Sequence, residues 1–197
     1  MTTWYTADLH FGHERIIELS HRPFATVQEM DDALVYRWNE RVTPTDEVFV
    51  LGDVVIPERA LVNVSRLNGR KILVPGNHDG CHWMHRRHMR ARRLYLEAGF
   101  SVILDDGRAH EHYLSYRHDR VAEVNLSHFP YRGGGDHTFV ERYGEWRLED
   151  TGVPLLCGHV HDAWKVKAGP AGSPMVNVGV DVWDFAPVDS ETLAGLL

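Results

Sequence analysis

Cysteine is scarce in this sequence, and its two residues, Cys81 and Cys157, are too few for a disulfide framework. Free thiols in a reducing compartment are therefore the expected state. The first residues, Met1-Thr2-Thr3-Trp4, lack the basic and apolar regions of a signal peptide. No apolar run approaches the length that spans a membrane. We expect a soluble cytoplasmic protein with no membrane partner.

Positive charge is also scarce, because 21 lysines and arginines face 28 aspartates and glutamates, for a formal net charge of −7. This balance argues against stable binding to nucleic acid, although a local positive site could still hold a phosphate. Apolar residues at 43% and charged residues at 25% are ordinary globular values, which argues against wholesale disorder. The length of 197 residues, without a linker or repeat, predicts one domain, 1–197. Histidine, with 14 residues, is the unusual component.

Strands and helices alternate in the first half of the chain. Three short apolar runs, 3–7, 47–51 and 71–74, are typical of buried strands. Between the first two, Thr26 and Glu29 form a capping box that predicts the start of a helix extending to about residue 41. The order predicts parallel βαβ units. The other expected elements are helices at about 14–20, 57–67 and 81–98, strands at 100–104, 111–116, 121–127, 153–157 and 173–178, and a short terminal helix capped by Asp189 or Ser190.

Polar groups follow each of the first three strands at its carboxyl end. Asp8 and His10 follow the first strand, Asp53 the second, and Asn77-His78-Asp79 the third. Parallel strands bring these ends to one edge of a sheet, where ligands bind. In extended backbone, residues i and i+2 point to the same side, so Asp8 and His10 should converge.

Two later strand exits add imidazoles. His128 follows one strand, and Gly158-His159-Val160-His161 follows another with the same two-residue spacing. His110 and His112 share that spacing, but they begin a strand instead of ending one. We therefore do not count His110 and His112 among the candidate metal ligands.

A basic helix is expected after Asp79, with five arginines between 86 and 93. His82, His85 and His88 lie three residues apart, which places them on roughly one face of that helix. Solvation is favoured over substrate contact as the role of this face. The glycine-rich loop at 133–135 is equally compatible with a plain connection and with a substrate-facing loop.

The strand exits together suit two divalent metal ions. Asp53 is the natural bridge, because a carboxylate has two oxygens. The absence of thiolates favours Mn, Fe, Zn or Ni over copper(I) or a structural zinc site, and we place Mn foremost. Two dications against two carboxylates leave a local charge of about +2, which attracts phosphate. Two metals about 3.5–4 Å apart can ionise a bridging water and hold phosphoryl oxygens. The seven candidate ligands are Asp8, His10, Asp53, Asn77, His128, His159 and His161.

These blocks resemble the five motifs of the calcineurin-like metallophosphoesterases, in the same order and over most of the chain. The segments 7–13 and 177–183 are similar to those of small phage and bacterial members. The resemblance implies an α/β fold, a four-layer α/β/β/α sandwich with two facing mixed sheets and the site at one edge. The matching blocks are Asp8-x-His10, Gly52-Asp53, Gly76-Asn77-His78-Asp79, His128 and Gly158-His159-x-His161.

The resemblance also implies how the ligands divide between the two metals, with one carboxylate shared. The first metal would be bound by Asp8, His10, Asp53 and His161, and the second by Asp53, Asn77, His128 and His159.

The resemblance further implies that His78 faces the substrate, with Asp79 holding its ring. Chemistry supports the first role, since an imidazolium can protonate a poor leaving group or steady its charge. A carboxylate neighbour would favour that charged form. His13, Arg132 and His137 are further candidates for contact with the phosphate or leaving group, and a structural role is at least as well supported for each.

The resemblance implies hydrolysis of a phosphodiester, such as a 2′,3′-cyclic nucleotide, by a hydroxide that bridges two metals. The partner would be a small phosphate ester or nucleotide, in a host cytoplasm if the chain is phage-encoded. Alternatives are a phosphomonoesterase, including a protein phosphatase, and a nuclease, which only the arginine segment supports. A non-catalytic binding module on the same fold is disfavoured, because none of the motif residues is missing.

Overall fold

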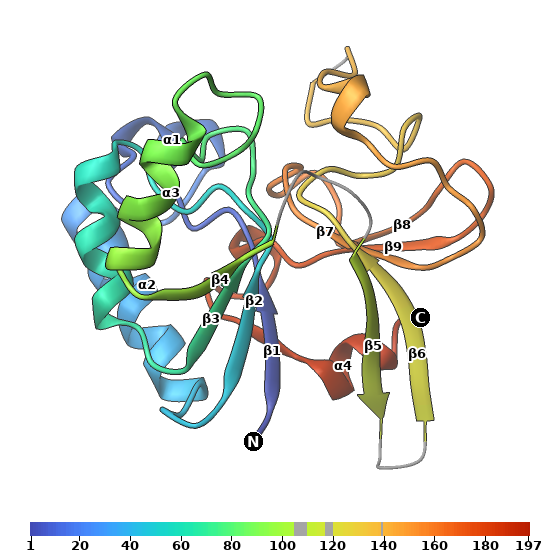
Figure 1. Ribbon diagram of the computed structural model, residues 1–197, viewed down its shortest axis with the longest axis horizontal. Coiled ribbons are helices and arrows are strands. Elements are labelled where there is room, and N and C mark those ends of the chain that lie inside the picture. Colours follow the sequence, from blue (N-terminus) through green and yellow to red (C-terminus); the bar gives the residue numbers. More distant parts are fainter. Residues whose placement is uncertain (105–109, 117–119, 139) are drawn as a thin grey trace.

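Two five-stranded sheets face each other in this computed structural model, which describes residues 1–104, 110–116, 120–138 and 140–197 (Figure 1). The first sheet has the order β10-β1-β2-β3-β4. Strands β1, β2, β3 and β4 are parallel to one another, and β10 pairs antiparallel with β1. Their bounds are β1 Thr3–Thr6, β2 Glu47–Val50, β3 Arg70–Leu73, β4 Phe100–Ile103 and β10 Val188–Asp189.

The second sheet has the order β5-β6-β7-β9-β8. Strands β6, β7 and β9 are parallel, and the two edge strands are antiparallel to their neighbours. Parallel strands in both sheets therefore end at the same rim of the sandwich (Figure 1). Their bounds are β5 His110–Tyr116, β6 Arg120–Leu126, β7 Leu155–Cys157, β8 Val166–Ala168 and β9 Pro174–Asn177.

Helices cover the outer face of the first sheet (Figure 1). The longest is α2, which Thr26 caps by accepting a hydrogen bond from the Glu29 amide. The outer face of the second sheet is covered instead by the connection between β6 and β7, where Tyr131 packs with Leu155 and Met175. The helical elements are α1 Glu14–Leu19, α2 Val27–Arg41, the 3₁₀ segment η1 Glu58–Arg66, α3 His88–Glu97, the 3₁₀ turns η2 Gly144–Trp146 and η3 Val180–Val182, and α4 Ser190–Ala194.

Strand alternation explains how one sheet builds two cores. In β2, Val48 and Val50 face the helices, whereas Phe49 faces the second sheet. Both faces are buried, so the strand reads as a continuous apolar run. Between the sheets, Tyr5 stacks on Phe49 with ring centroids 5.5 Å apart. These two cores fix the sheets against each other and so fix the rim where the polar loops gather.

The structure confirms the expected fold class of two facing mixed sheets within an α/β architecture. It corrects several elements. The helix expected from residue 81 begins only at His88, because turns occupy the preceding residues, and the 57–67 helix is 3₁₀. Strands β8 and β10 were not predicted. Asp189, not Ser190, caps α4. The sequence Asp105-Asp106-Gly107 predicts a turn after the strand at 100–104, and this segment lies outside the described residues.

The His82, His85 and His88 side chains consequently do not share a helical face. His82 is buried with its ring 4.9 Å from that of Trp146, His85 Nε2 lies 2.9 Å from the Asn77 carbonyl, and His88 stacks on a tryptophan.

Within the described residues, no helix has the length and apolar character that crossing a membrane requires. The side chains of His110 and His112 lie outside the described atoms, but β5 does begin at His110.

Candidate metal centre

The predicted polar residues lie on tight turns that follow the strands. Asp8, His10, Asp53, His159 and His161 have φ of 57°, 52°, 55°, 71° and 48°. Left-handed backbone at residues other than glycine costs roughly 1–3 kcal/mol each and gathers at functional sites. The convergence of Asp8 and His10 therefore comes from these turns, and the extended backbone that we expected there is wrong.

Glycines precede these turns because the carboxylates need the space beside them. A Cβ on Gly158 would lie 2.7 Å from Asp8 Oδ2, and a Cβ on Gly76 would collide with Asp53 Oδ1. Real Cβ atoms do not approach so closely, so both positions require glycine. The two short Gly-containing motifs thus pack directly against the acidic groups of the site.

Asp53 lies between the two imidazoles that the strand exits bring nearest to it. Its Oδ2 is 3.7 Å from His10 Nε2 and 3.5 Å from His128 Nε2. Its Oδ1 accepts a hydrogen bond from the His78 amide at 2.9 Å. His128 Nε2 is also 3.2 Å from Asn77 Oδ1. One carboxylate therefore faces both the half of the cluster that contains His10 and the half that contains His128.

Two groups of side chains could each hold a metal ion. In the first, one atom each of Asp8, His10 and His161 lie within 4.8 Å of one another, and in the second Asp8, Asp53 and His128 do so. Asp8 Oδ1 and both ring nitrogens of His10 are buried without a hydrogen-bond partner among the described residues. Buried polar atoms are normally satisfied, so these unsatisfied atoms are the donors that a bound cation would use.

The electrostatics of the cluster point the same way. Burial raises the pKa of Asp8 to about 6 and lowers the pKa of His10 well below its ordinary value. Burial also disfavours charge on Asp53 and His128, but their mutual attraction outweighs it. The pKa of Asp53 is therefore well below its usual range, and the pKa of His128 is about 9. A dication would take over the role that the His128 proton plays beside Asp53.

His161 is held from behind by a buried ion pair. Its Nδ1 lies 3.3 Å from Asp181 Oδ2, and Asp181 accepts hydrogen bonds of 2.8 and 3.0 Å from Arg22. Arg22 also donates to the Asp8 carbonyl at 2.7 Å. The pair thus ties the loop of Asp8 to the ring of His161. Neither Arg22 nor Asp181 was predicted to support the site, although Asp181 lies within the segment 177–183 that resembles the small phage and bacterial members.

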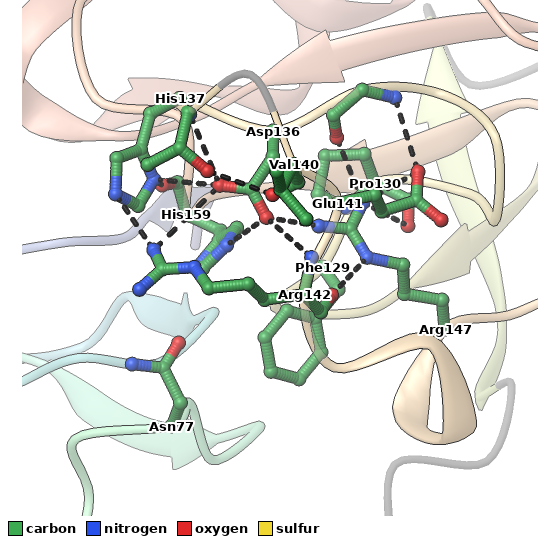
Figure 2. A network of polar contacts seen from close by, with 12 residues as sticks. Asn77, Phe129, Pro130, Asp136, His137, Val140, Glu141, Arg142, Arg147 and His159 are labelled. Atoms are coloured by element: carbon green, nitrogen blue, oxygen red, sulfur yellow. Dashed lines mark hydrogen bonds and ion pairs between the residues drawn. The ribbon is translucent and has the colours of Figure 1, made fainter.

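The other half of the cluster is held differently. His128 Nδ1 lies 2.8 Å from the Leu51 carbonyl. His159 Nε2 lies 3.2 Å from Asp136, a residue of the β6–β7 connection that sequence reasoning also missed (Figure 2). Asp136, His137 and His159 form a third group whose atoms lie within 4.8 Å of one another. The structure therefore directs His159 Nε2 at Asp136, while the His159 ring lies 5.3 Å from the ring of His128.

Asp79 does not hold the ring of His78. Its carboxylate accepts hydrogen bonds from the amides of Asp53, Val54 and Gly76 at 2.8–2.9 Å and from the Tyr95 hydroxyl at 3.0 Å. The expectation is wrong because the fully buried Asp79 side chain points into the turns and fastens them. Burial, with further contributions from nearby imidazoles, lowers the pKa of His78, so the expected charged imidazole is not supported either.

A cavity of about 260 Å³ opens onto the cluster. His78 is exposed and lies at this cavity, with its ring 5.6 Å from that of His10. His13 and His137 also line it, as expected of substrate contacts. Arg132 does not, because it bonds to Glu149 at 2.6 Å and to the Gly144 carbonyl. Arg142 does line the cavity, and its guanidinium lies 2.9 Å from His137 Nε2. Nothing in the sequence around the glycine-rich loop predicted this role for Arg142.

The fold and the Asp/His clusters define a class, α/β proteins of two facing mixed sheets with a candidate metal site at one rim. No protein-family model matches the chain. It is 35% identical over 195 residues to the Gene 66 protein of Mycobacterium phage L5, which covers 92% of this chain and 87% of the relative. It is 36% identical over 200 residues to the Gene 66 protein of Mycobacterium phage D29, which covers 94% and 92%. The chain belongs to the family of these phage Gene 66 proteins.

A solved structure shares the fold over its full length. The protein of unknown function AQ665 from Aquifex aeolicus matches with a TM-score of 0.68 and 24% identity, covering 100% of this chain and 99% of that one. At this identity the match establishes the architecture alone.

Proposed function

We propose that this protein is a calcineurin-like metallophosphoesterase that uses two divalent metal ions to hydrolyse phosphodiesters. The observation that carries the proposal is the position of Asp53 Oδ2, 3.7 Å from His10 Nε2 and 3.5 Å from His128 Nε2. A carboxylate that faces two groups of ligands can bridge two metals at the short separation that two-metal hydrolysis uses. The orphaned atoms of Asp8 and His10 support it independently.

We assign the ligands as two sets that share Asp53. Hard carboxylate oxygens with imidazoles and one amide suit Mn, and Fe, Ni or Zn are the alternatives. Bound dications would polarise the phosphoryl group and lower the pKa of a water between them. The first set is Asp8, His10, Asp53 and His161, and the second is Asp53, Asn77, His128 and His159.

The role of the protein is to position the ester and to assist the leaving oxygen. His78 is exposed at the cavity, and its backbone amide donates to Asp53, so its backbone is fastened beside the proposed ligands. A ring N–H there can donate to the leaving oxygen. His13 and His137 line the same cavity and would contact the substrate. Asp79 acts only by holding the turns that carry Asp53 and His78.

A small diester, such as a 2′,3′-cyclic nucleotide, is the substrate that we favour. A cavity of about 260 Å³ fits a small phosphate ester better than a polynucleotide or a folded protein partner. His78 would assist any ester that releases an alkoxide, and the preference for a diester comes from the resemblance to the small phage and bacterial members. The net charge of −7 opposes a nuclease.

The test is a substrate panel on metal-stripped protein refilled with one metal at a time. We expect Mn to restore cleavage of a 2′,3′-cyclic nucleotide and of bis-p-nitrophenyl phosphate well above that of p-nitrophenyl phosphate. Faster monoester cleavage would favour a phosphomonoesterase, and cleavage of single- or double-stranded polynucleotide a nuclease. Fewer than one bound metal, with no activity after Mn is added back, would leave a binding module.

A further inference from the structure

Asp136 is a buried carboxylate at the centre of a polar network in the β6–β7 connection (Figure 2). Its side chain is 0% exposed and pairs with Arg147, also 0% exposed, at 2.8 Å. It further lies 3.1 Å from His137 Nδ1 and 3.2 Å from both His159 Nε2 and the Arg142 amide. A buried charge with so many partners is costly to assemble unless its position matters.

The contact with His159 constrains which ring nitrogen can bind a metal. Because Nε2 meets a carboxylate, it is the nitrogen that carries the proton, and Nδ1 keeps the lone pair. His161 has the mirror arrangement, with Asp181 at its Nδ1, and His128 has the Leu51 carbonyl at its Nδ1. Each of these three imidazoles therefore has one nitrogen fastened by the protein, and the other nitrogen is the one that could bind a metal. In His128 that nitrogen is Nε2, which faces Asn77 Oδ1 and Asp53 Oδ2.

We propose that Asp136 is a positioning residue that fixes the tautomer and orientation of His159 for the second metal. The inference rests on the proposed two-metal function and deepens it. Asp136 also lies 3.7 Å from the Arg142 guanidinium, and both His137 and Arg142 line the cavity. One carboxylate thus ties the metal ligand His159 to the substrate-facing side of the cavity.

Two other roles must be separated from this one. Asp136, His137 and His159 could hold a metal of their own, since their atoms lie within 4.8 Å of one another. Alternatively, Asp136 could merely fasten the connection through Arg147, which also donates to the Gly135 carbonyl at 2.8 Å. A third bound metal would indicate the former, and a loss of stability without a change in metal affinity the latter.

The matched control is Glu141. It faces the same Arg147 at 3.6 Å and accepts hydrogen bonds from the Gly133 amide, so it also fastens the connection. None of the contacts described for it reaches His159. Glu141→Gln therefore reports the structural contribution of this network alone.

The experiment titrates metal-free protein with Mn²⁺, following free Mn²⁺ by electron paramagnetic resonance, and records the melting temperature of the metal-free form. We expect the wild type to bind two ions. Asp136→Asn should raise the dissociation constant of one site by about 10- to 100-fold and leave the other unchanged. Glu141→Gln should change neither site. Should Asp136→Asn fail to fold, Asp136→Glu keeps the charge beside Arg147 but displaces its oxygens, and the same single-site loss is expected.

Four outcomes would overturn the inference: a third ion in the wild type, wild-type affinity at both sites in the Asp136 variant, weakening of both sites equally, or an equal loss in Glu141→Gln. These are distinguishable from failure of the proposed function. If the wild type itself bound fewer than two ions, the two-metal site would be wrong, whereas two ions with an unaffected Asp136 variant would remove only the positioning role.

Discussion

The two halves of the candidate metal centre are built on different kinds of support. The first half, around His10 and His161, is held by the buried Arg22–Asp181 pair, which bonds directly to the backbone of the Asp8 turn. The second half, around His128 and His159, depends on a backbone carbonyl and on Asp136 in a long connection. One half is therefore fixed within the sandwich, and the other is completed by a segment that lies outside it. This difference predicts that the two metals can be weakened separately.

The change with the largest expected effect removes what the two halves share. Asp53→Ala should lose both metals, because Asp53 Oδ2 faces His10 and His128 together. Two-metal stabilisation of a transition state is worth several kcal/mol, so turnover should fall by about 10³-fold or more. Metal analysis and diester turnover measure this. If the variant kept two metals, the ligand assignment would be wrong.

The next largest effect concerns His78, which lies at the cavity beside Asp53 and His10 and to which we assign no metal. His78→Ala should keep both metals and lower turnover of a cyclic nucleotide by about 10²–10⁴-fold. The loss should be much smaller with bis-p-nitrophenyl phosphate, since p-nitrophenolate leaves without assistance. Parallel kinetics on the two substrates give the comparison. An equal loss on both would mean that His78 does not assist the leaving group.

The third prediction tests the separation of the halves directly. Asp181→Asn should weaken the first metal by about 10- to 100-fold while leaving the second intact, the reverse of Asp136→Asn. The reason is that Asp181 contacts His161 and Arg22 but no ligand of the second set among its described hydrogen bonds. Mn²⁺ titration of the two variants side by side measures this. Weakening of the same site by both would show that the halves are not independent.

The sequence predicted the candidate metal ligands much better than it predicted the residues that support them. Asp8, Asp53 and His161 could be found because each follows an apolar strand, and parallel strands bring their exits to one rim. The geometry of the turns could not be predicted, since alternation applies only to extended backbone and these residues have positive φ. Residues that the structure does bring together were therefore found by an argument that was partly wrong.

The supporting residues carry no local signal. Asp136 and Arg147 lie in a connection without periodicity. Arg22 and Asp181 contact each other although 159 residues separate them in the sequence. Asp79 was misassigned for a related reason. Its place in the motif suggested the ring of its neighbour His78 as partner. In the fold its carboxylate instead accepts hydrogen bonds from three backbone amides and from the Tyr95 hydroxyl. Tertiary partners of a buried polar group cannot be read from spacing.

A smaller effect is expected at the cavity, where the connection meets the substrate. Arg142→Ala should raise KM for a diester by about fivefold, since an exposed cation contributes roughly 1 kcal/mol. Arg132→Ala is the matched control, an exposed arginine of the same segment that bonds to Glu149 and lies outside the cavity lining. Steady-state kinetics at constant salt measures both. Equal effects of the two variants would remove Arg142 as a substrate contact.

The smallest effect on the site is expected from a carboxylate at the opposite end of the sheet. Asp46 precedes β2 and accepts hydrogen bonds from the Thr2 and Thr43 amides and the Thr43 hydroxyl. Burial opposes its charge, but these bonds outweigh it and lower its pKa from 3.8 to about 2. Because the folded pKa lies below the unfolded one, the charged group stabilises the fold fully above about pH 5, and this contribution is lost as the pH falls through 4 toward 2. Asp46→Asn should therefore leave metal content and turnover unchanged.

Urea unfolding of metal-free protein between pH 6 and pH 2 tests the sign of this last effect. The wild type should exceed Asp46→Asn in unfolding free energy by a constant amount above about pH 5, and the difference should shrink between about pH 4 and pH 2. Repeating the unfolding with Mn²⁺ added at pH 6 should not alter the difference, because Asp46 lies at the amino end of β2 and the proposed ligands lie beyond its carboxyl end. A difference that persisted at pH 2 would show that charge on Asp46 does not stabilise the fold, and a difference that required metal would show that the two ends of the sheet are coupled.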